Sequence, residues 1–411
     1  MNDKTLSVLR LITGCQIGSA RVFKALKAFS DPDDMFRVSA AYLLEAGFKE
    51  REFPTFLENK KEKAEKCLEY CVKNNIQIIT YYDDEYPPQL RQIKDPPAAL
   101  FVKGNFPEMA NQPVVSMIGT RTCTEFGEKL AAGLAYELAQ ADFVVVSGMA
   151  MGIDAYSHKG ALLAKGKTVA VLASGVDKPT PYCNKPIYDR IISSGNGAVI
   201  SEFLPGTDIK QFAYHQRNRI VSALSQAVLV VESGFGGGSM ITVDHALAQG
   251  RPVLAIPGAP GSPASYGTNE LIRTGALLCR GSLDIIEEFE RLLSKSLPRP
   301  ARKANIPDTD PLAKLEPRKQ KKAPSKKEKA EPLQKEIPVG EAPKKQSLSV
   351  RELLTDEEQT VVDALADGAL AADTVCDILG ISFPMAVSVL NSLELKGYAE
   401  ALPGGQYKLI D

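Results

Sequence analysis

The sequence predicts an α/β protein whose central domain is a doubly wound parallel sheet with helices on both faces. Two observations within residues 113–294 carry this prediction. Short, nearly continuous apolar runs rich in β-branched residues recur there, as expected of strands that are buried on both faces. Helical segments alternate with these runs, which is the pattern of a parallel sheet. The expected strands are Val114–Ile118, Phe143–Val146, Thr168–Leu172, Ala198–Ile200, Ala227–Val231 and Pro252–Ile256.

The expected helices occupy the segments between and after these strands. They are Cys123–Gln140, Asp154–Ala164, Asn184–Ser193, Ser239–Gln249, Asn269–Thr274 and Asp284–Leu293. In open α/β sheets, ligands bind at the carboxyl ends of the strands, beside the loops that lead into the helices. We therefore look for binding residues in those loops.

A small helical domain of the helix-hairpin-helix kind is expected over residues 1–75. Apolar residues recur at helical spacing in Leu6–Ile12 and again in Val22–Phe29. Gly14 and Gly18 lie between the two segments, as in a helix-hairpin-helix turn. Such turns can place backbone amides against a DNA phosphate, but a helical domain without a ligand explains the same pattern.

Residues 76–112 connect this domain to the sheet, and we assign them together with the sheet to one domain over 76–294. One or two short strands are expected in the connector. Its paired prolines at 87–88 and 96–97 exclude a long helix.

A disordered basic linker is expected over residues 295–350. The segment holds nine of the 27 prolines and no aromatic residue, so it cannot bury enough apolar surface to order itself. Its 15 Lys and Arg against 7 Asp and Glu give a net charge of +8. Such a segment can hold polyanions loosely or serve as a solubilising spacer.

Residues 351–411 are expected to form a winged-helix-like domain. With 3 basic and 11 acidic residues, its net charge is −8, so DNA phosphates should repel it and contact with a protein is favoured. Three helices are followed by two short strands around a Pro-Gly-Gly turn. These segments are Asp356–Leu365, Thr374–Leu379, Phe383–Lys396, Gly397–Glu400 and Gln406–Leu409, with the turn at 403–405.

Composition excludes several classes of protein. The 411 residues carry 49 basic and 50 acidic side chains, and no apolar run approaches the ~20 residues that span a bilayer. The first residues lack the apolar core of a signal peptide, so we expect a cytoplasmic protein. Seven scattered cysteines without a C-x-x-C pair and three histidines predict neither a disulfide framework nor a metal site, and no cofactor is expected.

The loop after the first expected strand, Ile118-Gly119-Thr120-Arg121, is suited to a phosphate. Gly119 would let a ligand approach the backbone, and the Arg121 guanidinium offers a fork of donors. An ion pair between Arg121 and a neighbouring carboxylate is the alternative.

The loop after the second expected strand, Ser147 to Asp154, is rich in small residues and leads into a helix. Ser147, Gly148 and Gly152 would leave backbone amides exposed at the positive end of that helix, which suits an anion. Tight packing explains the same residues equally well. Asp154 is placed to cap the helix.

Two further segments complete the candidate site. Arg217, Asn218 and Arg219 could bind phosphates and base edges together, although one of the two arginines should be structural because they face different sides of a helix. Gly238 and Ser239 end a Gly-Gly-Gly-Ser turn directly before a helix, which would be a second anion cradle. Two cradles and an arginine at one sheet edge predict a polyphosphate or a nucleic-acid backbone as the ligand.

Signatures of catalysis are missing from the sequence. His158, His215 and His245 lie far apart, and none has an obvious nucleophile beside it. There is no pattern of paired carboxylates and no metal-ligand spacing. We therefore expect a binding protein and no enzyme.

Together these motifs resemble the DNA-processing protein A family, also called DprA or Smf. They follow the order of the family across residues 80–280 and are jointly specific. The matching stretches are EYPPQL at 85–90, DPP at 95–97, KG at 103–104, IGTR at 118–121, SGMAMGID at 147–154, RNRI at 217–220, GSMIT at 238–242, GR at 250–251, IPG at 256–258, GTNELI at 267–272 and GA at 275–276.

The resemblance implies an extended Rossmann-like core that forms homodimers. It implies a non-enzymatic protein that binds and protects single-stranded DNA and helps load a RecA-type recombinase against single-strand-binding protein, which in naturally competent bacteria serves transformation. By motif position, Arg121 would contact a phosphate, and the Ser147–Asp154 turn and Gly238-Ser239 would line the DNA groove. Arg217 and Asn218 would lie alongside.

The sequence departs from the family at two places. Tyr214 and His215 stand where a Phe-Pro pair is usual, and Tyr182 stands where some members carry a DNA-contacting lysine. Lys178 and Lys185 are the two candidates to replace that lysine, and Tyr182 could stack on a base.

Two alternative functions stay open. One is a nucleotide phosphoribohydrolase of the same fold superfamily, which would carry glutamates in the helix after its glycine turn. Here no carboxylate follows Gly238 before Asp244. The other is a regulator that senses one small nucleotide.

Overall fold

The computed structural model forms two units by its contacts, Met1–Pro324 and Ser325–Asp411, and each is described by itself. The first unit is described almost throughout, and the second in parts. The described residues are 3–14, 19–29, 31–45, 48–50, 53, 56, 61–109, 111–234, 237–300, 356–365, 368, 370–371, 374–375, 378, 386, 389–390, 392–394, 398–402 and 406–409.

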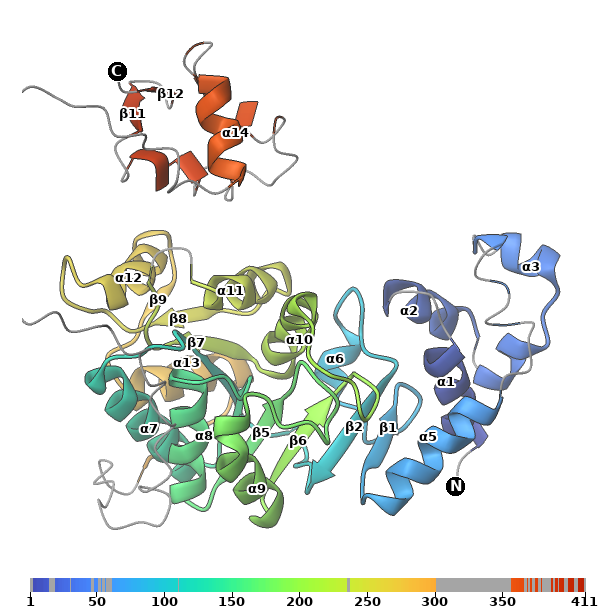
Figure 1. Cartoon of the computed structure of the whole chain (residues 1–411). Coiled ribbons are helices and arrows are strands. Elements are labelled where there is room, and N and C mark those ends of the chain that lie inside the picture. The colour runs from blue at the N-terminus through green and yellow to red at the C-terminus, as the bar shows by residue number, and fades with distance from the viewer. Residues whose placement is uncertain are drawn as a thin grey trace, which may run out of the picture. The chain divides into compact units, whose positions relative to one another are not determined.

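The first unit is built on a nine-stranded sheet (Figure 1) in the order β1-β2-β6-β5-β4-β3-β7-β8-β9. The strands from β6 to β9 in this order are parallel. Strand β2 pairs antiparallel with β6, and β1 pairs antiparallel with β2 at the edge of the sheet. The bounds are β1 Gln77–Thr80, β2 Ala99–Gly104, β3 Val114–Ile118, β4 Val144–Ser147, β5 Lys167–Val171, β6 Gly197–Ser201, β7 Ala227–Val230, β8 Val253–Ala255 and β9 Leu277–Leu278.

The predicted doubly wound α/β class is confirmed. All six expected strands form within two residues of their predicted ends, because each is an apolar run buried on both faces. The connector supplies β1 and β2. Strand β9 was not predicted, since two leucines carry no periodic signal.

Helices cover both faces of this sheet (Figure 1). One face carries α7, α8, α9 and α13, and the other carries α6, α10, α11 and α12. The short α6 was not predicted, and α10 was expected only as a helix around Arg217, without bounds. Their bounds are α6 Pro88–Arg91, α7 Glu125–Gln140, α8 Ile153–Leu163, α9 Lys185–Ser193, α10 Gln211–Leu224, α11 Ser239–Ala248, α12 Tyr266–Arg273 and α13 Ser282–Leu293; 3-10 turns lie at η1 Pro32–Phe36, η3 Tyr182–Asn184 and η4 Pro263–Ser265.

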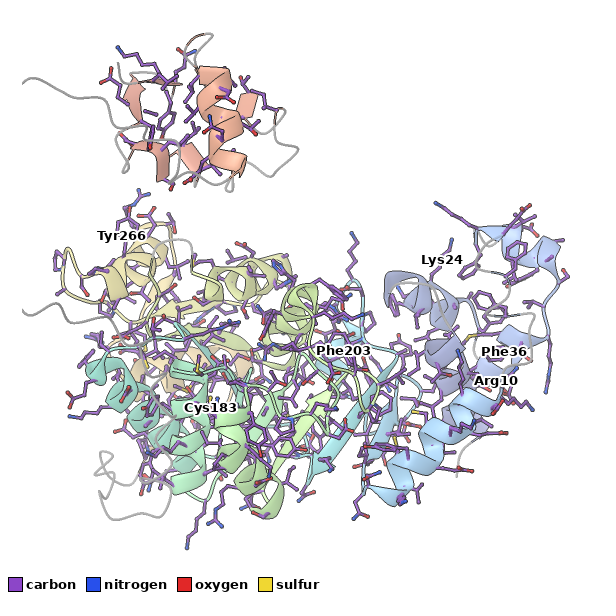
Figure 2. All side chains as sticks on the ribbon, in the orientation of Figure 1. Arg10, Lys24, Phe36, Cys183, Phe203 and Tyr266 are labelled. Atoms are coloured by element: carbon purple, nitrogen blue, oxygen red, sulfur yellow. The ribbon has the colours of Figure 1, made fainter. Side chains whose placement is uncertain are left out.

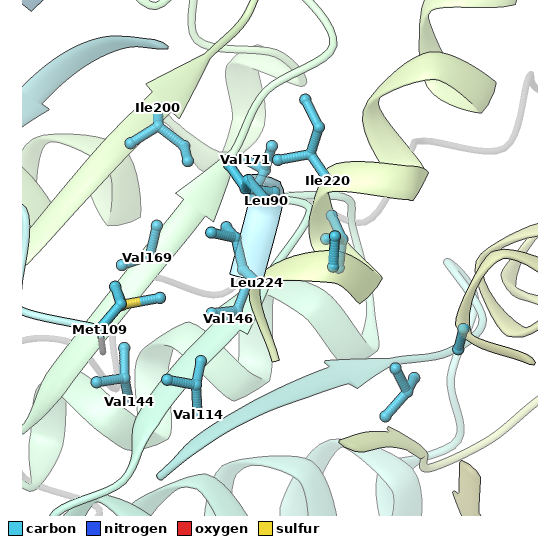
Figure 3. Packing of buried hydrophobic residues seen from close by; sticks show 14 of the residues in the cluster. Leu90, Met109, Val114, Val144, Val146, Val169, Val171, Ile200, Ile220 and Leu224 are labelled. Carbon is cyan, nitrogen blue, oxygen red and sulfur yellow. The ribbon is translucent and has the colours of Figure 1, made fainter. Parts of the chain in front are cut away.

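Alternating side chains of each strand enter the two cores. In β3, Val114 packs toward α10 while its neighbour Val115 packs toward α7. Figure 3 shows the first of these cores, where Val114, Val144 and Val146 of the sheet lie near Leu224 of α10. Each such side chain, fully buried, contributes roughly 1.5–3 kcal/mol to folding. The loops at the strand ends are therefore held on a rigid layer.

The N-terminal helices share their core with the β1 end of the sheet. These are α1 (Asp3–Gly14), α2 (Ser19–Ala28), α3 (Ala40–Glu45) and α5 (Lys61–Lys73). Leu9 of α1 packs in a cluster with Phe101 of β2, and Leu26 of α2 packs in one with Ala99. Gly18 of the predicted hairpin turn lies outside the described residues.

The sheet changes its winding direction between β3 and β7. From β3 the chain proceeds outward through β4 and β5 to β6, and then returns to place β7 on the other side of β3. The loops that follow β3 and β7 therefore diverge at the carboxyl ends of two neighbouring strands. Such a switch point is where open α/β sheets bind ligands.

The second unit contains α14 (Asp356–Leu365) and a three-stranded sheet in the order β10-β12-β11. The predicted first helix forms, and β11 (Ala399–Leu402) pairs antiparallel with β12 (Gln406–Leu409) as expected, while β10 (Leu370–Ala371) adds a third strand. The turn at 403–405 and the segment 301–355, which includes most of the predicted linker, lie outside the described residues. The same holds for much of the two remaining predicted helices, 374–379 and 383–396.

Among the residues that the structure describes, we find no helix with both the length and the apolar character needed to cross a lipid bilayer.

Candidate nucleic-acid interface

Two adjoining cavities open at the carboxyl edge of the sheet. The larger, about 600 Å³, lies at the switch point and is lined by the loops after β3, β4 and β7 and by α10. The smaller, about 120 Å³, extends toward the loop after β5. We call them the strand-end cavities. Four residues line both of them: Arg121, Gly148, Tyr214 and Arg217.

Arg121 presents an exposed guanidinium to both cavities. Its carbon Cζ lies 4.7 Å from the centroid of the Tyr214 ring, so a cation–π contact with α10 orients it. No carboxylate of the described residues forms an ion pair with it, and the alternative of a charge-paired Arg121 is not what the structure shows. A cation held in place with its donors open to solvent is suited to bind a phosphate.

Gly119 and Gly152 bring together the backbones that carry Arg121. A Cβ atom on Gly119 would lie 2.6 Å from the Ile153 side chain and 2.7 Å from the Glu232 carbonyl oxygen. Gly152 has φ +75° and packs directly on the carbonyl of Thr120. Gly119 lines the larger cavity, where we expected it to admit a ligand, and protein fills only the side on which a Cβ would stand. Both glycines position the Arg121 loop.

In the Ser147–Asp154 turn, two of the amides that were expected to bind an anion are bound by a carboxylate of the protein itself. The Asp154 carboxylate accepts hydrogen bonds from the amides of Gly148, at 3.0 Å, and Ala150, at 3.3 Å. Ser147 is fully buried, and its hydroxyl donates to the Met117 carbonyl at 2.6 Å. This turn already contains its own anion.

Asp154 also does not cap α8 as predicted. The cap position is Gly152, and Asp154 stands in the first turn with its carboxylate directed back at the preceding loop. Complete burial raises the pKa of Asp154, and the positive charge of Arg217 acts in the opposite direction.

Arg217 is a buried structural arginine that also contributes to the cavity wall. Its guanidinium donates to the carbonyls of Gly148 and, at 2.6 Å, Val171, at the ends of β4 and β5. Its Nε donates to Asn218 Oδ1 at 3.0 Å. Burial lowers the pKa of Arg217, while Asp154 raises it. With 4% of its surface exposed, it has little freedom to reach a ligand.

Arg219 is not brought to the cavities. It is buried on another side of α10, where it forms ion pairs with Glu202 and, at 3.2 Å, with Asp95. We expected one of the two arginines to be structural, and both are held by groups of the protein. The reason is the α10 geometry, since residues 217 and 219 face different directions on one helix.

The turn before α11 exposes its last glycine to solvent. Gly238 is exposed, with no atom within 4 Å of an added Cβ, and no side chain caps the first turn of α11. Ser239 lines the larger cavity, with its hydroxyl 2.9 Å from that of Ser233. Asn218 borders the same space. This helix N-terminus can bind an anion.

Tyr182 and Lys185 flank the smaller cavity without lining it. Pro181, which precedes them, is part of its wall. The Tyr182 side chain is 74% exposed. Lys185 Nζ lies 2.5 Å from Asp189 Oδ2, so its charge is shared with a neighbour on α9.

The comparisons with known proteins agree with this architecture. Residues 77–290 match the sequence profile described as DNA recombination-mediator protein A, and residues 342–405 match that of the DprA winged helix domain. The first match spans more than half of the chain. The chain belongs to the DNA recombination-mediator protein A family.

Individual relatives show how far this likeness extends. Protein Smf of Escherichia coli is 31% identical over 391 residues, covering 92% of each chain. The DNA processing protein DprA of Streptococcus pneumoniae is 40% identical over 212 residues, which are 51% of this chain and 72% of that protein. The crystal structure of this pneumococcal protein superimposes with a TM-score of 0.60 and 30% identity, covering 70% of this chain and 99% of that one.

The sequence did not indicate two residues, Glu232 and Asn184, whose hydrogen bonds fix the loops around the strand-end cavities. The Glu232 carboxylate accepts from the Thr124 amide at 2.9 Å and fills the N-terminus of α7, which leaves that helix end unavailable to a ligand. Asn184 donates to the carbonyls of Met149, at 2.8 Å, and Ala150, at 3.0 Å. A polar residue directly after the apolar run of β7 was the available signal for Glu232.

His158 lies inside the protein, away from the strand-end cavities. His158 is fully buried, its Nδ1 lies 2.7 Å from Thr168 Oγ1, and burial lowers its pKa to about 3, so it is neutral at neutral pH. Within the described ranges, no cluster of three His, Cys, Asp or Glu side chains is arranged to hold a metal ion.

Proposed function

We propose that this protein acts in DNA processing as a non-enzymatic binder of single-stranded DNA. One observation carries the proposal: the exposed Arg121 guanidinium and the uncapped α11 N-terminus at Gly238-Ser239 line one cavity at the switch point of the sheet. Both groups favour phosphates, and together they provide two anion sites along one edge. Membership of the DNA recombination-mediator protein A family supports the same conclusion.

The chemistry of the cavities favours a nucleic-acid backbone over a single base or a particular sequence. Arg121 would bind one phosphate, and the amides before α11 would bind another. Asn218 is the neutral amide beside them. Phosphate contacts fix a strand in place and carry no sequence information. We therefore expect binding that tolerates sequence, with Tyr182 as a stacking contact.

The proposal is tested by fluorescence anisotropy with three labelled ligands: a 30-residue oligothymidylate, a duplex of the same length and a mononucleotide. Tight, salt-sensitive binding of the single strand alone supports it. Tight binding of the mononucleotide would instead support a nucleotide-sensing regulator. Release of a free base from a nucleoside monophosphate would support a phosphoribohydrolase.

We further propose that the protein protects incoming single strands and helps a RecA-type recombinase displace single-strand-binding protein, as in natural transformation. The support is family membership together with a binding edge that can hold several phosphates. The test is recombinase-dependent strand exchange on DNA precoated with single-strand-binding protein. The proposal predicts that adding this protein shortens the lag, and an unchanged lag would contradict it.

We propose a homodimer that uses the free edge of the sheet. Strand β9 pairs with β8 alone among the described strands, and its Leu277 and Leu278 side chains are 40% and 48% exposed. An unpaired edge strand with exposed leucines is a ready surface for a second chain. Sedimentation should give a dimer for the wild type and a monomer for Leu278→Arg; a monomeric wild type would contradict the proposal.

We propose that the chain is organised in four segments. They are a helical domain over 1–75, the sheet domain over 76–294, a linker over 295–350, and an acidic winged-helix-like domain over 351–411 that contacts protein. The support is the reversal of charge between the last two segments and the match to a winged helix domain. Limited proteolysis should cut first within 295–350. Earlier cleavage elsewhere would contradict these boundaries.

A further inference from the structure

Four exposed aromatic side chains share one place in the fold. Phe126, Tyr182, Phe212 and Tyr266 are 64%, 74%, 56% and 51% exposed. Each stands in the first turn of the helix that follows a strand: α7 after β3, η3 after β5, α10 after β6 and α12 after β8. Because crossover helices begin at the carboxyl edge of a parallel sheet, all four stand at the edge that holds the strand-end cavities. We call them the rim aromatics.

The rim aromatics are most of the exposed aromatic side chains in the described residues. The other two, Tyr42 and Tyr70, lie on the N-terminal helices α3 and α5. Within the described part of the sheet domain, no exposed aromatic residue stands at the amino edge. Large rings left in water on one edge of a sheet are typical of a binding surface.

Tyr266 is fixed to the end of the larger cavity at β7 and β8. The amide of Gly267, the next residue, donates to the Ser233 carbonyl at 2.8 Å, and Ser233 lines that cavity. Gly267 has to be glycine at this contact, since a Cβ there would lie 2.6 Å from the Gly234 carbonyl oxygen. Figure 2 shows Tyr266 at the outer surface of α12.

Phe212 stands in the first turn of α10, the helix whose Tyr214 lines both cavities. It stands two residues before Tyr214, the ring that holds Arg121, and the Nζ atom of Lys210 lies 6.0 Å from the centroid of the Phe212 ring. A ring next to an exposed cation offers a base a stacking face and its phosphate an opposite charge. Tyr182 adjoins the smaller cavity because the residue before it, Pro181, lines that cavity.

The distance between the outermost rim aromatics indicates how many nucleotides a bound strand would span. From β6 to β8 the sheet order is β6-β5-β4-β3-β7-β8, which is five strand spacings or roughly 24 Å. At ~3.4 Å per stacked nucleotide this distance corresponds to about seven nucleotides of one strand. A mononucleotide could reach one ring, whereas a polymer could reach several.

We propose that the rim aromatics stack on the bases of a single strand whose phosphates follow the strand-end cavities. The inference rests on the proposed function and extends its one stacking contact, Tyr182, to a row of rings that bind bases by their π-faces. Stacking of this kind accepts every base and requires unpaired bases. It therefore explains how the edge selects single strands from duplex DNA, which the phosphate contacts alone do not.

The test compares a 30-residue oligothymidylate with an abasic deoxyribose-phosphate oligomer of the same length. The wild type should bind the oligothymidylate at least about tenfold more tightly, because each stacked base adds severalfold. The double variant Phe212→Ala/Tyr266→Ala should lose most of this preference and keep the slope of affinity against salt. Tyr42→Ala is the matched control and should behave as wild type.

A second variant, Phe212→Leu/Tyr266→Leu, keeps apolar bulk without aromatic faces and should also lose the preference. Equal binding of both oligomers by the wild type would overturn the inference and leave the proposed function standing. A double alanine variant that keeps the full preference would overturn it as well. Failure of the wild type to bind either oligomer would overturn the proposed function itself.

Discussion

The turn after β4 and the turn after β7 look alike in sequence but differ in what they leave open. Both are rich in glycine and both lead into a helix at the same sheet edge. After β4, Asp154 accepts the amides of Gly148 and Ala150, and Arg217 donates to the Gly148 carbonyl. After β7, no side chain of the described residues caps the start of α11, and Gly238 faces open space.

This difference shows that a glycine-rich turn is an anion site only if the protein has not already supplied the anion. At β4, the buried carboxylate of Asp154 and the buried guanidinium of Arg217 each bind the backbone of the turn, which makes the turn part of the core. At β7 the same kind of turn is available to a ligand. Substitutions in the first turn should therefore affect stability, and substitutions in the second should affect binding.

Arg217→Ala should cause the largest decrease in the free energy of unfolding. It removes the donors to Gly148 and Val171 and leaves Asp154 buried without a positive charge beside it. Breaking such a buried pair typically costs about 3–5 kcal/mol. Urea unfolding followed by circular dichroism measures the free energy of unfolding. A loss below about 1 kcal/mol would show that the β4 turn does not depend on this arginine.

Gly152→Ala should have the next largest effect and lower the free energy of unfolding by about 2–3 kcal/mol. Its φ of +75° is strained for alanine, and the new Cβ would press on the Thr120 carbonyl. Because the Arg121 loop would have to move, single-strand binding should weaken in the same variant. The readouts are the urea midpoint and anisotropy. Unchanged stability would contradict the packing role given to this glycine.

His158 on α8, behind the β4 turn, gives a pH test. Burial lowers its pKa to about 3 in the folded protein, from an ordinary value of 6.5, so only the unfolded state binds the proton between these values. Its contribution to stability is present above pH 6.5 and declines as the pH falls, by about 2 kcal/mol at pH 5. His158→Gln should lack this decline when unfolding free energies are compared at pH 7 and pH 5. Parallel pH profiles would contradict the assignment.

Gly238→Ala should have the smallest effect on stability, within about 0.5 kcal/mol. Its φ of −58° suits alanine, and a Cβ there contacts nothing. The methyl group would nevertheless stand in the path of a phosphate, so single-strand affinity should fall about fivefold. The two quantities are measured by thermal unfolding and anisotropy. A large loss of stability with normal binding would show that the turn after β7 serves packing and does not bind the ligand.

The sequence predicts the sheet well because its strands are apolar runs. The burial that requires apolar residues in a strand is the same burial that places the strand inside the sheet. It also indicates the correct edge, since topology brings the loops after β3, β4 and β7 together. It cannot separate Arg121 from Arg217, because the two differ only in which groups of the fold approach them. Asp154 is likewise an ordinary helix-start residue in sequence, and only the folded loop directs its carboxylate at Gly148.

The central claim is that Arg121 binds a phosphate of a single strand at the switch point of the sheet. It is tested most directly by the affinity of Arg121→Ala for a 30-residue oligothymidylate between 50 and 200 mM salt, with Arg190→Ala on α9 as the control that removes one exposed charge elsewhere. We predict that Arg121→Ala binds more weakly and that its log–log salt slope falls by about 0.7, the value of one phosphate contact on a single strand. Equal affinity and equal slope for Arg121→Ala and wild type would contradict the claim.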